Sequence, residues 1–191
     1  MTESTSIGDM FPDMTGPEAP IISGVAHDSS EAMMTLRGIP DMPGRVTAVF
    51  TGLADAGVNI DMIVQALAAA DSTHRVADIS FTFPESQLRK VEEFVDSHKE
   101  QLEYQLADVN TQIGKISLVG VGMKTHSGIT ARFFKALSDE QINVLMISTS
   151  EIRLSALVPL ENLTTAVRSV HTAFGLDANT IEAVVYGGTG R

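Results

Sequence analysis

Cysteine is absent from the 191-residue chain, which excludes disulfide bonds, cysteine-ligated zinc, iron–sulfur clusters and a cysteine nucleophile. Positive charge is scarce, because 13 Lys and Arg stand against 24 Asp and Glu, a net charge of −11. Such an acidic surface repels phosphate backbones, so nucleic acid is not expected as a partner. No apolar run reaches the roughly 18–20 residues that cross a bilayer. The start MTESTSIGDMFPDM has neither the basic residues nor the apolar stretch of a secretory signal. We expect a cytoplasmic protein without membrane contact.

Motifs for catalysis and for cofactors are missing as well. The five histidines are scattered and never form an i, i+4 pair around a carboxylate, as a metal site on a helix would require. No Gly-x-Gly-x-x-Gly or Walker phosphate loop is present, and the glycine-rich end at residues 187–190 has no helix after it. The sequence therefore predicts a protein that is not an enzyme and that needs neither a metal ion nor a cofactor.

Hydrophobic residues make up 43% of the chain, which is enough to build a core. Residues 1–20 are acidic, broken by proline and glycine, and predicted to form a disordered tail. A short extended piece is expected at 21–26. Strands are then expected at 32–39, 59–68, 75–83, 105–112, 115–123, 143–150, 153–158 and 181–186, and helices at 46–54, 85–99, 129–138 and 160–174. Gly57 and Gly175 stand where helices are expected to end.

The expected elements have the order βαββαβ, and this order occurs twice along the chain. A shift of 84 residues aligns seven identical residues within twenty positions, among them Gly44 with Gly128 and Asn59 with Asn143. The fold expected from this repeat is α+β, with two ferredoxin-like βαββαβ modules. Each module is small and leaves sheet edges open, so pairing with another module is favoured.

Two similar strand–loop–helix junctions are the best candidates for a binding site. In the first, Gly44 would leave backbone N–H groups free at a helix start, where they bind carboxylates, and Asp41 could take an ammonium group. These are the two ends of an α-amino acid. The alternative is a plain turn in which Asp41 caps the helix. The second junction, residues 124–128, allows the same two interpretations. The polar run 148–151 is either an exposed strand end or a surface that faces a ligand.

Several stretches of the sequence resemble one known family. They are IISGVAHDSSEA, NIDMIVQ, SGITARFFKALSD, ISTSEIRLSALV and the ending VYGGTGR. Together they resemble the regulatory region of actinobacterial aspartokinase, in which two ACT domains follow the kinase domain. Some bacteria also make this region as a separate regulatory (beta) subunit. The resemblance covers residues 21–191 and implies a regulatory chain that lacks the kinase domain and does not phosphorylate aspartate.

The resemblance also implies feedback control by threonine or lysine bound at ACT–ACT interfaces. The assembly would be a homodimer, or a heteromer with an aspartokinase catalytic chain. The first implied ligand site uses Asp41, Gly44, Val46 and Gln65 of one chain, closed by Asn143 and Val144 of its partner. A second possible ligand site would use Asn59, Ile60, Asp61, Lys124, His126 and Gly128.

The implied domains are residues 31–112 for the first ACT domain, and residues 21–30 with 113–191 for the second. Relatives commonly read Asp-Lys-Pro-Gly-Glu at the first junction, where this chain has residues 41–45, DMPGR. This loss of polar groups leaves open a stand-alone ACT paralogue, retuned to another amino acid or desensitised, in a different aspartate-derived pathway. A structural partner that assembles the kinase without binding a ligand is a further alternative.

Overall fold

The computed structural model describes residues 21–67, 75–121, 123 and 127–176. The predicted tail at 1–20 and the predicted strand at 181–186 lie outside these ranges. Within them, no helix combines the length and the apolar character that a bilayer span requires.

The chain forms two compact units. One contains residues 30–113, and the other joins the residues up to Ser29 with those from Gly114 onward. The second unit is discontinuous because β1 (Ile21–Asp28) pairs antiparallel with β6 (Ile113–Val121), with Ala26 opposite Ser117. The early strand is therefore part of the sheet of the second unit.

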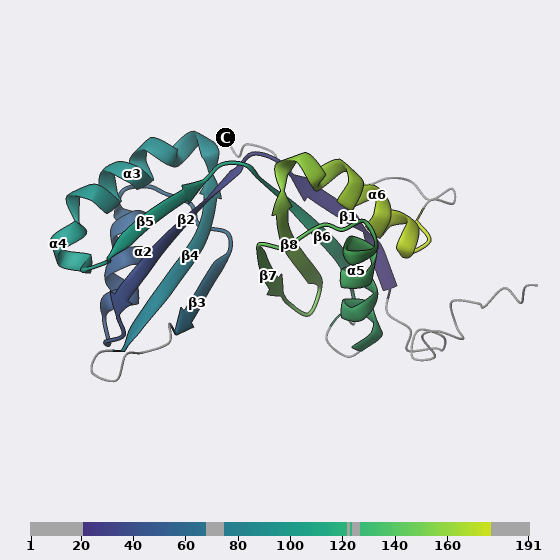
Figure 1. Cartoon of the computed structure of the whole chain (residues 1–191), viewed down its shortest axis with the longest axis horizontal. Helices are drawn as coiled ribbons and strands as arrows, with labels where there is room; N and C mark the ends of the chain where they lie inside the picture. The colour runs from purple at the N-terminus through teal and green to yellow at the C-terminus, as the bar shows by residue number, and fades with distance from the viewer. Residues whose placement is uncertain (1–20, 68–74, 122, 124–126, 177–191) are drawn as a thin grey trace, which may run out of the picture. The chain divides into compact units, whose positions relative to one another are not determined.

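The unit of residues 30–113 is an antiparallel sheet with helices on one face (Figure 1). Its strands are β2 (Glu31–Pro40), β3 (Ile63–Leu67), β4 (Val76–Pro84) and β5 (Leu106–Asn110), in the order β3-β4-β2-β5. Its helices are α2 (Arg45–Asp55), α3 (Leu88–Ser97) and α4 (Lys99–Leu102), and the 3-10 turn η2 (Glu85–Gln87) precedes α3.

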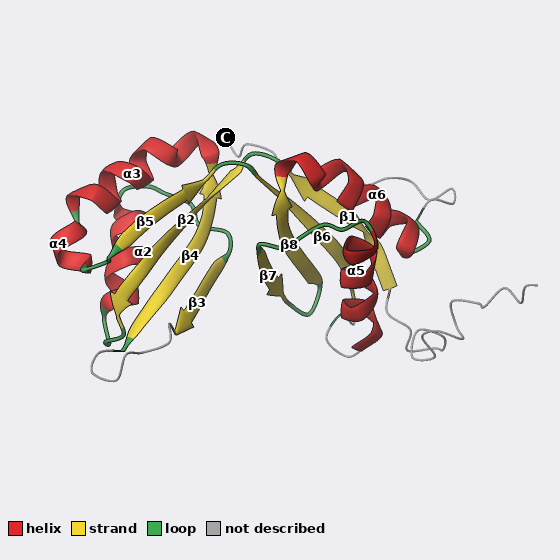
Figure 2. Ribbon diagram, viewed as in Figure 1, coloured by secondary structure: helices red, strands yellow, loops and turns green. Residues whose placement is uncertain are grey.

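The other unit repeats this plan, as Figure 2 shows by its strands in yellow and helices in red. Its sheet has the order β1-β6-β8-β7, with β7 (Met146–Thr149) and β8 (Arg153–Pro159). The helices α5 (Ser127–Asp139) and α6 (Leu163–Ala173) lie on one face, and the 3-10 turn η3 (Leu160–Asn162) precedes α6. β1 lies beside β6 as β5 lies beside β2, so both units have the predicted ferredoxin-like arrangement.

The cores follow from the alternation of side chains along the central strands. On β4, Ile79, Phe81 and Phe83 are buried against Val49 of α2 and Phe94 of α3. Burying a large apolar side chain completely contributes about 1.5–3 kcal/mol. Since the core residues of these strands face one way, the helices are held on that face of the sheet, while the other face carries both polar and apolar side chains, Leu157 among them.

The repeat extends to the hydrogen bonds that end α2 and α5. The N–H of Gly57 donates to Ala54 O at 2.9 Å, and the N–H of Val58 donates to Leu53 O at 2.9 Å. At the end of α5, Gln141 and Ile142 make the same two bonds at 2.9 and 3.0 Å. This pattern closes the last turn of a helix through one residue with positive φ. The prediction for Gly57 is confirmed by its φ of 71°, while Gln141 adopts 58° without being glycine.

Several element boundaries differ from the predictions. The strand expected at 59–68 begins only at Ile63, because the N–H of Asn59 donates to the Gln87 side chain instead of a neighbouring strand. The strand expected at 143–150 covers Met146–Thr149, since Ser150 N–H donates to Arg153 O and closes a tight turn. The single helices expected at 85–99 and 160–174 each begin with a 3-10 turn after a proline, and the first is interrupted at His98.

Gly52 of α2 lies directly against the Phe94 ring of α3. A Cβ atom added there would lie 2.2 Å from a ring carbon of Phe94, whose side chain is in the core. We expect Gly52→Ala to lower the free energy of unfolding by about 1–3 kcal/mol, the usual cost of overpacking. Urea denaturation measures the loss. Gly24→Ala is the control, because an added Cβ there meets nothing within 4 Å; equal stability of the two variants would contradict this packing.

Candidate functional site

The junction between β2 and α2 leaves a helix start open. Gly44 is the N-cap residue of α2 with φ 93° and ψ −19°, and no side chain caps the helix. The first helical bond runs from the N–H of Ala48 to Gly44 O at 2.9 Å. The N–H of Arg45 donates to Met42 O at 3.3 Å. The next N–H groups of a helix have no acceptor within it, and they carry the positive end of its dipole. Because Gly44 has no side chain and no atom near its Cβ position, an anion can approach these groups.

Asp41 lies beside this helix start but does not cap it. Its Oδ2 is 3.3 Å from Nε of Arg75, and its own N–H donates to Arg75 O at 2.9 Å. The Arg75 side chain is 71% exposed. An ion pair this open contributes only about 0–1 kcal/mol, so another cation can replace the guanidinium at little cost. The alternative in which Asp41 caps α2 is therefore wrong.

Gln65 and Val46 complete the first predicted set within the same unit. β4 has β2 on one side and β3 on the other, with Pro40 opposite Val76 and Leu67 opposite Ala77. The ends of β2 and β3 thus lie at the same end of the sheet. Gln65 is opposite the buried Ile79, so it points to the face that the helices cover, at the exposed edge strand. Val46 is partly buried and packs against the core.

Arg45, directly after Gly44, fixes the start of α2. Its guanidinium donates to the carbonyl oxygen of Gln101 and to the carboxylate of Glu103, at the end of α4. The side chain of Arg45 is 23% exposed, and its charge is paired with that of Glu103, so the pair adds little net charge at the helix start.

The other predicted residues divide between the two units. Asn143 is exposed and Val144 packs against the core of the unit that contains α5, in the segment before β7. Gly128 lies in the first turn of α5. In the first unit, Asn59 and Asp61 are exposed and Ile60 packs against the core. Lys124 and His126 lie outside the described residues. The polar run 148–151 is exposed, at the end of β7 and in the turn that follows.

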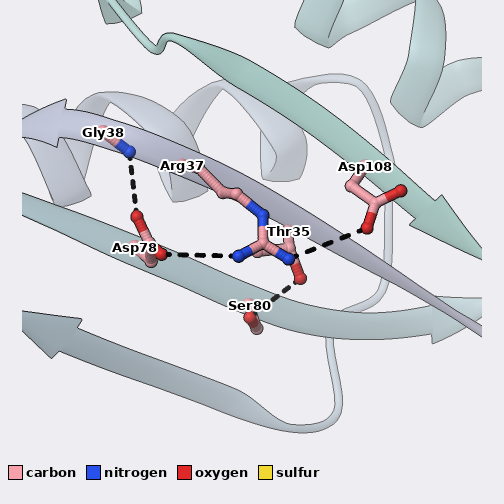
Figure 3. A network of polar contacts seen from close by, with 6 residues as sticks. All are labelled: Thr35, Arg37, Gly38, Asp78, Ser80 and Asp108. Atoms are coloured by element: carbon pink, nitrogen blue, oxygen red, sulfur yellow. Dashed lines mark hydrogen bonds and ion pairs between the residues drawn. The ribbon is translucent and has the colours of Figure 1, made fainter. Parts of the chain in front are cut away.

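The sequence analysis missed a polar network on the helix-free face of the unit 30–113 (Figure 3). Arg37 lies between two carboxylates, with Nη1 at 3.8 Å from Asp78 and Nη2 at 3.9 Å from Asp108. Asp78 also accepts the N–H of Gly38 at 2.9 Å, where the register of β2 shifts. The hydroxyls of Thr35 and Ser80 bond each other at 2.9 Å.

The second unit has its own hydroxyl pair on the two central strands, Ser117 with Ser155 at 2.8 Å. The polar alternation along residues 76–83 was the signal for such contacts, but it does not identify the partners. None of the described bonds of these hydroxyls is to a histidine or a carboxylate that could activate them. These pairs therefore join central strands and form no catalytic set.

Burial shifts the pKa of two residues that are not part of the β2–α2 junction. Burial raises the pKa of Tyr104, and the Asp96 carboxylate raises it further; the hydroxyl donates to Val95 O at 3.3 Å. Burial lowers the pKa of Arg132, whose guanidinium lies 4.8 Å from the centre of the Phe174 ring. Both groups take part in packing, so neither shift indicates acid–base chemistry.

Comparison with known proteins places this geometry in a family. Residues 116–174 match the ACT domain. The aspartokinase of Corynebacterium glutamicum is 43% identical over 187 residues, which is 98% of this chain and 44% of that protein. The regulatory subunit of aspartate kinase from Thermus thermophilus, in its ligand-free form, is 34% identical with a TM-score of 0.74. That match covers 81% of this chain and 99% of the other. The chain belongs to the ACT-domain regulatory family of aspartokinase.

The aspartate kinase of Synechocystis has the same fold, with a TM-score of 0.79 and 34% identity over 90% of this chain and 30% of that one. This chain spans less than half the length of the curated aspartokinases it matches. The chain shares the tandem ACT region with them, and the β2–α2 junction lies within this region.

The two carboxylates around Arg37 have different hydrogen-bond and ion-pair partners, so removing each should change the free energy of unfolding by a different amount. Asp78→Ala leaves the N–H of Gly38 without its acceptor and should lower the free energy of unfolding by about 1–3 kcal/mol. Asp108, 60% exposed, has the 3.9 Å contact with Arg37, so Asp108→Ala should cost about 0–1 kcal/mol. Urea denaturation of both variants compares the two losses; a loss at Asp108 equal to that at Asp78 would contradict this assignment.

Proposed function

We propose that this chain is a non-catalytic regulatory module that binds an amino acid and transmits its presence to an aspartokinase catalytic chain. The observation that carries the proposal is the open start of α2 at Gly44, with the half-buried carboxylate of Asp41 beside it, which is paired only with the exposed side chain of Arg75. Feedback control of the biosynthesis of aspartate-derived amino acids is the role that this family membership supports.

The ligand is an α-amino acid, held at both of its charged ends. Its carboxylate accepts the N–H groups at the start of α2, close to Val46 and the guanidinium of Arg45. Its ammonium group takes the place of Arg75 at the carboxylate of Asp41. Its side chain extends toward Gln65 on β3. Because Gln65 is uncharged and can hydrogen-bond a hydroxyl, threonine fits this site better than lysine.

Closure of the site requires a second chain. β3 is an edge strand with three exposed apolar residues, Ile63 at 51%, Val64 at 36% and Leu67 at 59%, and no charged residue. Such an edge readily pairs with another chain. In the proposed assembly, Asn143 and Val144 of a second copy, or of a catalytic chain, cover the ligand. Residues 59–61 with Lys124, His126 and Gly128 form the pseudo-equivalent second site.

Regulation then follows from linkage. An amino acid that binds only the paired arrangement shifts the population toward that arrangement, and it inhibits the kinase only as far as it prefers that state. The chain itself supplies binding energy and association, while phosphoryl transfer belongs to the catalytic partner.

A second candidate function rests on the residues of the junction itself. Met42 is 52% exposed, and Arg45 is engaged with Glu103, at positions where the family resemblance implies Lys and Glu. Met42 and Arg45 differ in charge from Lys and Glu, so they change the electrostatic surroundings of the proposed ligand. A stand-alone ACT paralogue retuned to another amino acid is the function that this difference favours.

A thermal-shift screen of the purified chain with each amino acid at millimolar concentration tests the proposal. A ligand at one hundred times its dissociation constant stabilises by about 2.7 kcal/mol, which raises Tm by several degrees. We expect threonine to give the largest shift. A larger rise in Tm with another amino acid would support the retuned paralogue. The absence of any shift would contradict amino-acid binding by the isolated chain.

The variant Asp41→Asn locates the site. It removes the charge that holds the ammonium group, so affinity for the amino acid should fall about tenfold or more, while the free energy of unfolding changes by about 1 kcal/mol or less. Asp108→Asn removes the same charge at the helix-free face and is the matched control. Equal loss of the thermal shift in both variants would contradict the role of Asp41.

A further inference from the structure

The unit that contains α6 has a pocket of about 530 Å³ between the end of β1 and α6. Its size is within the range of small-molecule sites. Leu160, Leu163 and Val167 give it an apolar wall, and Leu163 and Val167 also belong to or pack against the core. This wall is therefore anchored by the core packing. The pocket lies in the other unit from the β2–α2 junction, so the two sites are separate.

The same pocket gathers three basic side chains. They are His27 on β1, and Arg168 and His171 on α6. The described residues that line it include no Asp or Glu, and they add the hydroxyls of Ser29 and Thr164. A guanidinium stays charged at any physiological pH, and imidazole N–H groups donate hydrogen bonds. In a chain with a net charge of −11, a pocket whose described polar lining is one guanidinium, two imidazoles and two hydroxyls favours an anion.

The internal repeat shows that the fold itself does not require basic side chains at these positions of α6. Pro84 and Pro159 each precede a 3-10 turn and then a helix, so α3 and α6 align with an offset of 75 residues. At this offset, the positions of Val167, Arg168 and His171 are occupied on α3 by Glu92, Glu93 and Asp96. The equivalent helix of the other unit thus carries three acidic side chains at these positions. The basic side chains of α6 are therefore not required for the packing of a helix on the sheet.

We propose that this pocket binds a small organic anion, a carboxylate or a phosphate monoester on an apolar body. The guanidinium of Arg168 pairs with the anionic group, with His27 and His171 as further donors. The apolar body packs against Leu163 and Val167. The site gives the chain a second ligand that is chemically unlike an α-amino acid, because nothing in the lining holds an ammonium group.

The test follows the imidazole NMR signals of the full chain during titration with phenyl phosphate, phenylacetate and inorganic phosphate at constant ionic strength. We expect saturable shifts of the His27 and His171 signals, assigned with His27→Gln and His171→Gln. The His98 signal should stay in place, because its ring lies 4.4 Å from the Phe94 ring and bonds to Ser97 in the other unit. Phenyl phosphate or phenylacetate should bind about tenfold more tightly than inorganic phosphate, because the apolar ring is buried. The tighter of the two identifies the anionic group.

Arg168→Gln supplies the decisive variant. It should weaken binding of the aromatic anion about tenfold or more, while Arg89→Gln on α3, which removes the same charge from the exposed ion pair with Glu93, should leave it unchanged. Equal weakening by both variants, or equal affinity for all three anions, would overturn the proposal and indicate general attraction of anions. The amino-acid thermal shift should survive Arg168→Gln, so failure of this site and failure of the proposed regulatory site are distinguishable.

Discussion

Packing of helices against only one face of each four-stranded sheet is the constraint on which the other features depend. In the unit 30–113, Phe81 and Phe83 of β4 are fully buried beneath the helices. This packing fixes where β2 ends and where α2 begins, so the open helix start at Gly44 is set by the core and not by a local cap. It also leaves one helix-free face and two edges per sheet. A module of this size gains much of its further stability by covering such edges.

In the proposed function, ligand binding and association depend on the same end of the sheet. The proposed amino-acid site lies there, beside the exposed apolar strand β3, and its proposed cover comes from another chain. A ligand at that place would stabilise the interface as well as the domain. The ion pair of Asp41 with Arg75 lies at the proposed ammonium position, and the exposure of Arg75 makes it easy to replace. Under this proposal the carboxylate of Asp41 is paired both with and without the ligand.

The sequence was enough to predict the βαββαβ order and the internal repeat, because helix and strand periodicities and the turn at Gly57 are local signals. It also identified Asp41 and Gly44 as neighbours of a helix start. It did not predict that Arg75 pairs with Asp41, that Asp78 holds the N–H of Gly38, or that Phe94 packs on Gly52. Each of these contacts joins residues about 35–45 positions apart. The pocket joins residues still farther apart, since His27 and Arg168 meet only after β1 has paired with β6. Such contacts depend on the register and the packing angle, and these are properties of the folded sheet.

The central claim is that the amino acid binds at the junction and favours the paired state. Sedimentation velocity of the chain over a wide range of concentrations, with and without the amino acid that gives the largest thermal shift, tests it most directly. The account predicts that the ligand lowers the dissociation constant of the dimer, and that Asp41→Asn removes this effect while the ligand-free chain sediments as before. A ligand that raises Tm but leaves the monomer–dimer equilibrium unchanged would contradict it.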